Sequence, residues 1–316
     1  MSFVAGTATS SLDLLARLVT FLTTDAALAA ATPAQTWTLL KDDTTVVTTG
    51  NETVRRTVYL RGPGLAGTDQ IYVIISAYDA AGVGYYNWEI RGANGFSATD
   101  AIGAQPGVSP PVYVSLWNTT IGYRFAASGR RFVVSAKVGT VYASAYAGLI
   151  LPYETPAQWG YPLYIGGTSG VRAKLYSDTT DTQHSGFHDP AGDASYPGAY
   201  VRWVDATWLS VVNARSNSGY DTLRQIWPYM ALGGNDQRSV STSTREAPDG
   251  SYAITPLIVH GPSPYMGCYG EIDGCGYVSG FGQVAEAAIT IGADTWRALP
   301  NVYRSGVGDY WALKES

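Results

Sequence analysis

Two histidines and two cysteines are the residues with the most evident potential for chemistry. His184 and His188 are close in sequence, as are Cys268 and Cys275, and together they contain the donor set of a tetrahedral zinc site. Their spacing opposes this reading. Zinc-binding cysteines are usually separated by about two to four residues, and the two histidines would share a face only on a helix, which the nearby glycine and proline disfavour. We therefore predict no metal site.

The same two cysteines are too few for a disulfide framework. A disulfide between Cys268 and Cys275 would be geometrically easy across the turn that contains Gly270 and Gly274. It conflicts, however, with synthesis in a reducing cytoplasm, where stable disulfides are rare. Reduced thiols are the expectation.

An acidic loop over residues 177–198 is the second candidate for ion binding. It is polar and rich in glycine and proline, and loops longer than about 12–15 residues are usually functional or disordered. Its aspartates supply the hard oxygen ligands that Ca²⁺ prefers, although their spacing does not match an EF-hand. The alternative is that they only solvate the loop. The candidate ligands are Asp178, Asp181, Asp189 and Asp193.

A glycosidase would need two carboxylates on either side of a sugar. Glu89, Glu154 and Asp205 lie on or beside aromatic strands, but nothing in the sequence pairs them. The sequence also lacks a nucleophile elbow, a P-loop, a dinucleotide-binding glycine motif and a zinc-protease motif. We therefore expect a protein that is not an enzyme and that has no cofactor.

Composition narrows the range of partners. The net charge is −5 and only 14% of residues are charged, so there is no basic surface for nucleic acid, and much of the exterior must be uncharged or covered by other proteins. The sequence contains 23 Tyr and 9 Trp but only 7 Phe, an excess that favours interfaces or glycan surfaces over a purely internal role. No secretion signal and no apolar run of membrane-spanning length is apparent.

The most strongly constrained stretch is residues 151–164, LPYETPAQWGYPLY, in which prolines fix an extended, bent backbone that carries four large aromatics. We interpret it as a docking surface, together with the aromatics of the C-terminal segment 301–316. The predicted interface residues are Tyr153, Trp159, Tyr161, Tyr164, Tyr310 and Trp311.

Local patterns predict a mainly β protein with one short N-terminal helix over residues 11–22, which Ser10 or Ser11 can cap. Strands are expected at residues 37–40, 57–61, 71–78, 86–90, 112–117, 132–138, 140–150, 171–176, 200–204, 207–213, 288–291, 296–299 and 310–313, with a helical turn at 221–227. Residues 132–138 alternate as a strand with one buried face does. We predict two β-sandwich or barrel-like domains, residues 1–120 and 121–316.

Four blocks of sequence resemble a group of tailed-bacteriophage virion proteins. They are GRRFVVSAKVGTVYASAYAGLILPYETPAQWGYPLYIGG, DGSYAITPLIVHGP, YGEIDGCGYVSGFG and NVYRSGVGDYWALK, and the group is found among tail and baseplate components. The resemblance covers most of the chain from Trp88 onward and contains no catalytic motif. It implies a structural role in a virion, after synthesis in the bacterial host cytoplasm.

The leading hypothesis is therefore a tail-tip or baseplate component that binds copies of itself, as a ring, and adjoining tail proteins. The alternative is a glycan- or receptor-binding module on the virion surface, in which exposed aromatics meet host polysaccharide and the loop 177–198 takes part in recognition.

Overall fold

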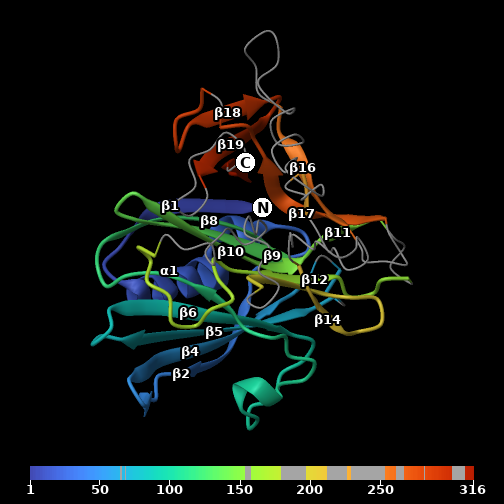
Figure 1. Cartoon of the computed structure of the whole chain (residues 1–316). Coiled ribbons are helices and arrows are strands. Elements are labelled where there is room, and N and C mark those ends of the chain that lie inside the picture. Colours follow the sequence, from blue (N-terminus) through green and yellow to red (C-terminus); the bar gives the residue numbers. More distant parts are fainter. Residues whose placement is uncertain are drawn as a thin grey trace, which may run out of the picture.

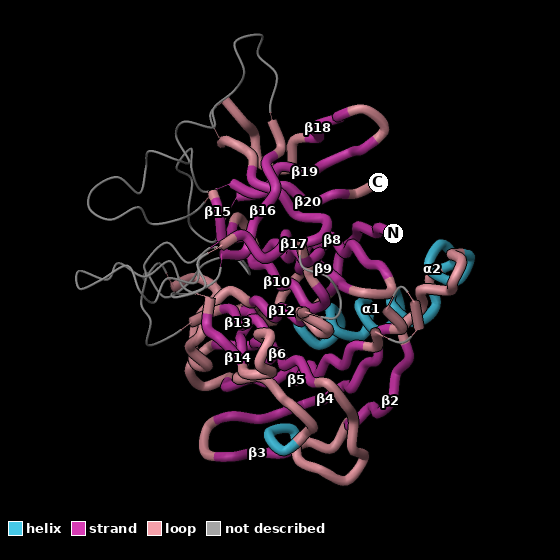
Figure 2. The backbone as a smooth tube through the Cα atoms, turned by 90° about the vertical axis from the view of Figure 1, so that its right-hand side faces the viewer, coloured by secondary structure: helices cyan, strands magenta, loops and turns pink. Residues whose placement is uncertain are grey.

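Three antiparallel sheets are stacked in layers in the computed structural model (Figure 1). It describes residues 1–64, 66–67, 69–153, 158–178, 197–211, 226–228, 253–260, 267–280, 282–300 and 310–316. Figure 2 shows the same layers from the side, with both ends of the chain near the place where two of the sheets meet. The expectation of a mainly β protein with a helix near the N-terminus is confirmed.

The first layer, called the N-terminal sheet, has the strand order β2-β4-β5-β6-β7, with β3 paired to β4. Long strands β4, β5 and β6 form its centre, and one of its faces is apolar. The strands are β2 Thr38–Asp43, β3 Val47–Thr49, β4 Glu52–Gly62, β5 Ile71–Ala80, β6 Tyr85–Ala93 and β7 Val112–Val114.

The middle layer, called the central sheet, has the order β1-β8-β9-β10-β12-β13-β14. Its first strand comes from the extreme N-terminus and pairs with a strand more than a hundred residues later. The strands are β1 Ser2–Ala8, β8 Ile121–Ser128, β9 Arg131–Val138, β10 Val141–Leu149, β12 Leu163–Gly166, β13 Ala199–Arg202 and β14 Trp208–Ser210.

The third layer, called the C-terminal sheet, has the order β15-β16-β17-β20-β19-β18, and β11 pairs with β17. Its strands are β11 Leu151–Pro152, β15 Ile226–Trp227, β16 Thr255–His260, β17 Cys268–Tyr277, β18 Ala288–Ile291, β19 Asp294–Pro300 and β20 Tyr310–Lys314.

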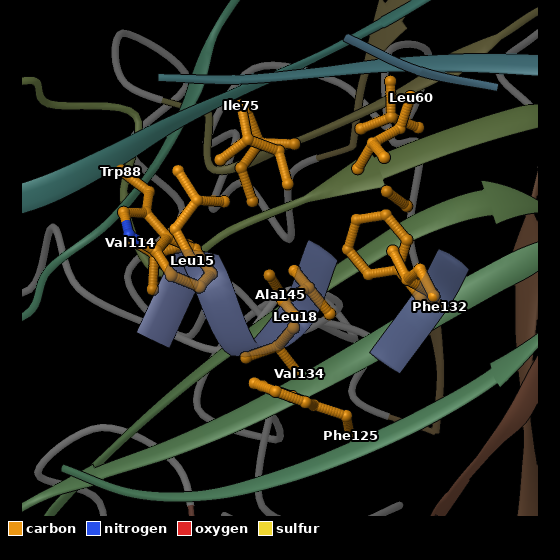
Figure 3. Packing of buried hydrophobic residues seen from close by; sticks show 14 of the residues in the cluster. Leu15, Leu18, Leu60, Ile75, Trp88, Val114, Phe125, Phe132, Val134 and Ala145 are labelled. Carbon is orange, nitrogen blue, oxygen red and sulfur yellow. The ribbon is translucent and has the colours of Figure 1, made fainter. Parts of the chain in front are cut away.

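Helix α1, Ser11–Thr24, lies between the N-terminal and central sheets (Figures 1 and 3). The Ser10 side chain accepts a hydrogen bond from the backbone N–H of Asp13, which caps the helix as its sequence predicts. Figure 3 shows Leu15 and Leu18 among side chains of both sheets. A short helix α2, Ala26–Ala30, and a 3₁₀ turn, Ile102–Ala104, complete the helical elements of the described chain.

Both faces of the central sheet are buried at its middle strands β9 and β10, which corrects the expectation of a one-sided strand at residues 132–138. Phe132 and Val134 face the helix and the N-terminal sheet, whereas Val133 lies in a second apolar cluster with the C-terminal sheet. Even Arg131 is only 1% exposed. Period-2 alternation could not reveal this, because the second face is covered by strands that come more than a hundred residues later.

The first core crosses the predicted boundary at residue 120. The cluster that contains Leu60 and Trp88 of the N-terminal sheet also contains Phe125 and Phe132 of the central sheet. Strand β1 likewise belongs to the central sheet through its pairing with β8. The division into residues 1–120 and 121–316 stays a prediction, but the packing joins its two parts through one core.

Most expected strands are present, with ends shifted by a few residues. Residues 171–176 form no strand. Of the predicted helical turn at residues 221–227, residues 221–225 lie outside the described residues, and residues 226–227 are strand β15, which corrects the prediction there. Local pattern did not predict strands β1, β3, β8, β11, β12, β15, β16 and β17. Across the described part of the chain, no helix has the combination of length and hydropathy that would let it cross a membrane.

The C-terminal segment forms β20, an interior strand hydrogen-bonded to β17 on one side and β19 on the other. Trp311 is 1% exposed and packs between the central and C-terminal sheets. This placement corrects the expectation that Tyr310 and Trp311 lie on a docking tail, because a strand paired on both edges belongs to the chain's own core.

We expect Trp311→Ala to lower the free energy of unfolding by about 3–5 kcal/mol, since it leaves a large cavity between two sheets. Val284→Ala is the control because Val284 is 74% exposed, and it should change stability by no more than about 0.5 kcal/mol. Urea denaturation followed by tryptophan fluorescence measures both. Equal effects of the two substitutions would contradict the interior placement of β20.

Candidate functional site

The predicted docking segment contributes its largest side chain to an internal aromatic cluster. Trp159 is 2% exposed, and its ring lies 5.2 Å from Trp203 and 6.0 Å from Tyr269, between centroids. Its indole Nε1 donates to the carbonyl oxygen of Arg202 at 2.9 Å. A buried tryptophan with a satisfied N–H stabilises the packing of the sheets. Trp159 therefore cannot meet a partner without leaving the core.

The other predicted interface residues differ in exposure. Tyr164 is fully buried, and Tyr161 is half-buried, with its hydroxyl donating to the carbonyl of Ala93 at 3.1 Å. Tyr153 is 53% exposed, and its hydroxyl lies 3.4 Å from the Glu271 carboxylate. Of the six predicted residues, Tyr153 alone offers most of a ring to solvent. Whether this segment contacts another chain stays a prediction, and Tyr153 is the residue on which it depends.

The predicted ion ligands are not brought together within the described residues. Asp178 accepts a hydrogen bond from the Lys174 ammonium group at 2.7 Å, so its carboxylate is already paired with a positively charged side chain. Asp181, Asp189 and Asp193 lie outside the described residues. The calcium hypothesis for this loop stays untested beyond Asp178.

The four-residue zinc set considered from sequence is divided. Cys275 is buried in the core between the sheets, and burial raises the pKa of its thiol well above the usual value. Cys268, on the same strand, is exposed and lies 3.7 Å from His260, measured from Sγ to Nε2. His184 and His188 lie outside the described residues. Sequence spacing had not suggested the pairing of His260 with Cys268.

The two described candidate carboxylates of a glycosidase, Glu89 and Asp205, are each hydrogen-bonded to other groups. Glu89 is buried on the N-terminal sheet, where it accepts hydrogen bonds from Arg91 at 2.7 Å and from Arg172. Asp205 accepts from the backbone N–H and the hydroxyl of Thr207 in a turn, and Glu154 lies outside the described residues.

Sequence reasoning missed a polar cluster around Glu286. Its carboxylate accepts hydrogen bonds from Lys137 Nζ at 2.7 Å, Tyr142 Oη at 2.6 Å and an Arg124 Nη at 3.0 Å. These donors come from β9, β10 and β8, whereas Glu286 precedes β18. The cluster borders a cavity of about 120 Å³ beside Gly6 and Gly122.

The backbone at Glu286 is in the left-handed region, with φ of 68°, a conformation that costs a non-glycine residue about 1–3 kcal/mol. Its N–H donates to Ala298 at 2.8 Å and its carbonyl accepts from Arg297 at 2.9 Å. The surrounding contacts therefore hold the strained residue in place. No local sequence signal identifies such a position, since the donors to its carboxylate are more than a hundred residues away.

The protonation state of Glu286 determines what this cluster can do chemically. Partial burial acts to raise the pKa of the Glu286 carboxyl, but the hydrogen bonds from Lys137, Tyr142 and Arg124 outweigh burial and lower the pKa from 4.5 to about 2. Glu286 is consequently ionised at neutral pH and has no proton to donate. The arrangement suits an electrostatic link between two sheets and lacks the proton donor that a glycosidase acid would need.

A second link between the same sheets is more deeply buried. Arg131 of β9 donates from Nε to the Asp273 carboxylate of β17 at 3.2 Å and from one Nη to Met1 Sδ at 3.0 Å. Gly274, with φ of 71°, lies directly against the guanidinium, where any Cβ would collide with it. The glycine is therefore required both by its backbone conformation and by the space that Arg131 occupies.

The comparisons with known proteins give no family for this chain. No protein-family model matches the sequence. No curated protein matches it either.

We expect the depressed pKa of Glu286 to make stability depend on acid. A lowered folded-state pKa stabilises the protein above about pH 4.5, and this contribution is lost as the pH falls from 4.5 toward about 2. Glu286→Gln retains the size and the strained backbone but removes the charge. The variant should lose less free energy of unfolding across this interval than the wild type, as measured by urea denaturation at a series of pH values. Parallel pH curves would contradict the assignment.

Glycine substitutions test the buried link. Gly274 and Gly292 both have positive φ, but a Cβ at Gly292 meets nothing within 4 Å. Each Gly→Ala substitution forces an alanine into the left-handed backbone conformation, which costs about 1–2 kcal/mol. Gly274→Ala should cost at least about 2 kcal/mol more, because it also displaces a buried ion pair. Thermal and urea unfolding of the two variants give the difference, and equal losses would show that the Arg131 contact contributes nothing.

Proposed function

We propose that this protein is a structural component of a tailed-bacteriophage virion, in the tail tip or baseplate, where it assembles with copies of itself and with adjoining tail proteins. In this proposal the chain acts by contact and carries out no reaction. The resemblance of the four sequence blocks supports the virion setting, and the low share of charged residues, 14%, supports a surface that other subunits cover.

The observation that carries the assembly proposal is the free edge of the C-terminal sheet. Within the described residues, β18 is hydrogen-bonded on one side only, to β19. Its sequence, Ala-Ile-Thr-Ile, has no charge and no proline, and Ile291 is 43% exposed. Single-chain proteins usually protect such edges with charges, proline or bulges. An unprotected, uncharged edge is suited to pairing with a strand of a neighbouring subunit.

Electron microscopy of assembled particles tests the virion setting. An epitope inserted at Gly82, in the exposed turn between β5 and β6 where nothing lies within 4 Å of an added Cβ, should label one fixed position on the tail. Label that is absent from purified particles, while the tagged chain is present and folded in the lysate, would refute the proposal.

Substitution of the β18 edge tests the assembly contact. Thr290→Lys places a charge on the free edge and should reduce incorporation into particles by about tenfold or more, which corresponds to about 1.4 kcal/mol. Val47→Lys is the matched control, because Val47 is 53% exposed on β3, an edge strand of the N-terminal sheet. Incorporation is measured by quantitative immunoblotting of purified particles. Equal effects of the two lysine substitutions on incorporation would refute the assignment of β18 as the assembly contact.

A glycan-binding role is the second candidate, and Tyr153 favours it. An exposed ring beside a carboxylate, here Glu271 at 3.4 Å, offers a sugar both a stacking face and a hydrogen-bond acceptor. Trp159 cannot serve this role, since it is buried. Binding to host cell-wall polysaccharide or lipopolysaccharide that is lost in Tyr153→Ala and kept in Tyr153→Phe would establish this role. Absence of binding by the wild type would exclude it.

A further inference from the structure

The Cys268 and His260 side chains form a pair that the proposed function does not use. His260 ends β16 and Cys268 begins β17, and the two residues lie directly opposite each other in the antiparallel register. Side chains opposite each other in such a pair lie on the same face of the sheet. The Cys268 side chain is exposed, so solvent and dissolved ions reach it.

We propose that Cys268 and His260 bind a thiophilic divalent cation of the Zn²⁺ type. Their donor atoms, Sγ and Nε2, are 3.7 Å apart. With zinc bonds of about 2.3 Å to sulfur and about 2.05 Å to nitrogen, a tetrahedral angle sets these atoms about 3.6 Å apart. The pair therefore has the separation of two ligands of one ion without any rearrangement.

The chemistry of the donors selects the class of cation. A thiolate and an imidazole suit zinc, cadmium or cobalt, whereas calcium and magnesium require oxygen ligands. A further negative charge, Glu271, lies three residues after Cys268 on β17. Tyr153 connects the two positions, because its backbone N–H donates to the Tyr269 carbonyl at 2.8 Å and its hydroxyl lies 3.4 Å from the Glu271 carboxylate. This local negative field attracts a cation.

Within the described residues no group of three or more metal ligands occurs, so among these residues the pair supplies two ligands. This differs from a closed structural zinc site, which takes four protein ligands. It also differs from the set considered from sequence, since Cys275 lies buried away from solvent.

Titration with Cd²⁺ alone tests the site, because a cadmium–thiolate bond absorbs in the ultraviolet. The wild-type chain should develop this absorption and saturate, and Zn²⁺ should displace it. Cys268→Ser should abolish the signal, and His260→Gln should weaken Cd²⁺ binding by about tenfold or more, the size of effect found even for outer-sphere partners. Cys275→Ser is the matched control on the same strand and should leave the titration unchanged.

A measurement on the wild type alone removes dependence on the folding of the variants. Bound Zn²⁺ should slow the alkylation of Cys268 by iodoacetamide by about tenfold or more, because a thiolate that binds the metal is not free to react. Mass spectrometry of the peptide that contains Cys268 measures the rate. Undiminished Cd²⁺ binding by His260→Gln would overturn the proposal, since it would show that the Cys268 thiol binds the ion without His260. Alkylation of Cys268 at the same rate with and without Zn²⁺ would also overturn it.

Discussion

Burial of the central sheet on both faces is the constraint on which the rest of the structure depends. One face packs against α1 and the N-terminal sheet, and the other packs against the C-terminal sheet. Successive residues of a strand point to opposite faces, so β9 and β10 contribute apolar residues to both cores. This doubles the apolar area that each strand buries, and it fixes the register, because a slip of one residue would exchange the two cores.

The polar groups at the second interface follow from the same constraint. A charge that two sheets enclose must be paired, because an unpaired one would cost several kcal/mol in desolvation. Arg131 meets Asp273, and Glu286 meets three donors from three adjacent strands. Both links join the central sheet to the C-terminal sheet. The strained backbone of Glu286 is tolerated because its position is determined by contacts on both sides of the interface.

The aromatic residues have an internal role that composition alone did not indicate. Several buried rings donate their polar hydrogen to a backbone carbonyl: Trp37 to Ser128 at 2.8 Å, Trp88 to Ser11 at 2.9 Å and Tyr146 to Leu149 at 2.9 Å. Large side chains with one satisfied polar atom fill the wide spaces between stacked sheets. An excess of Tyr and Trp over Phe therefore does not by itself indicate an external surface, and the exposed features are instead Tyr153, the β18 edge and the Cys268 pair.

The sequence by itself determined the local elements. Ser10 and the apolar stripe after it specify α1, and alternating or continuous apolar runs specify β5, β6 and β10, because these signals arise from neighbours in the chain. Only the tertiary structure decided which faces are covered and which groups meet. Trp159, Trp311 and Arg131 are buried by strands far away in sequence, and His260 meets Cys268 through the register of β16 and β17. Such contacts depend on the pairing of distant strands, which residue type and spacing do not encode locally.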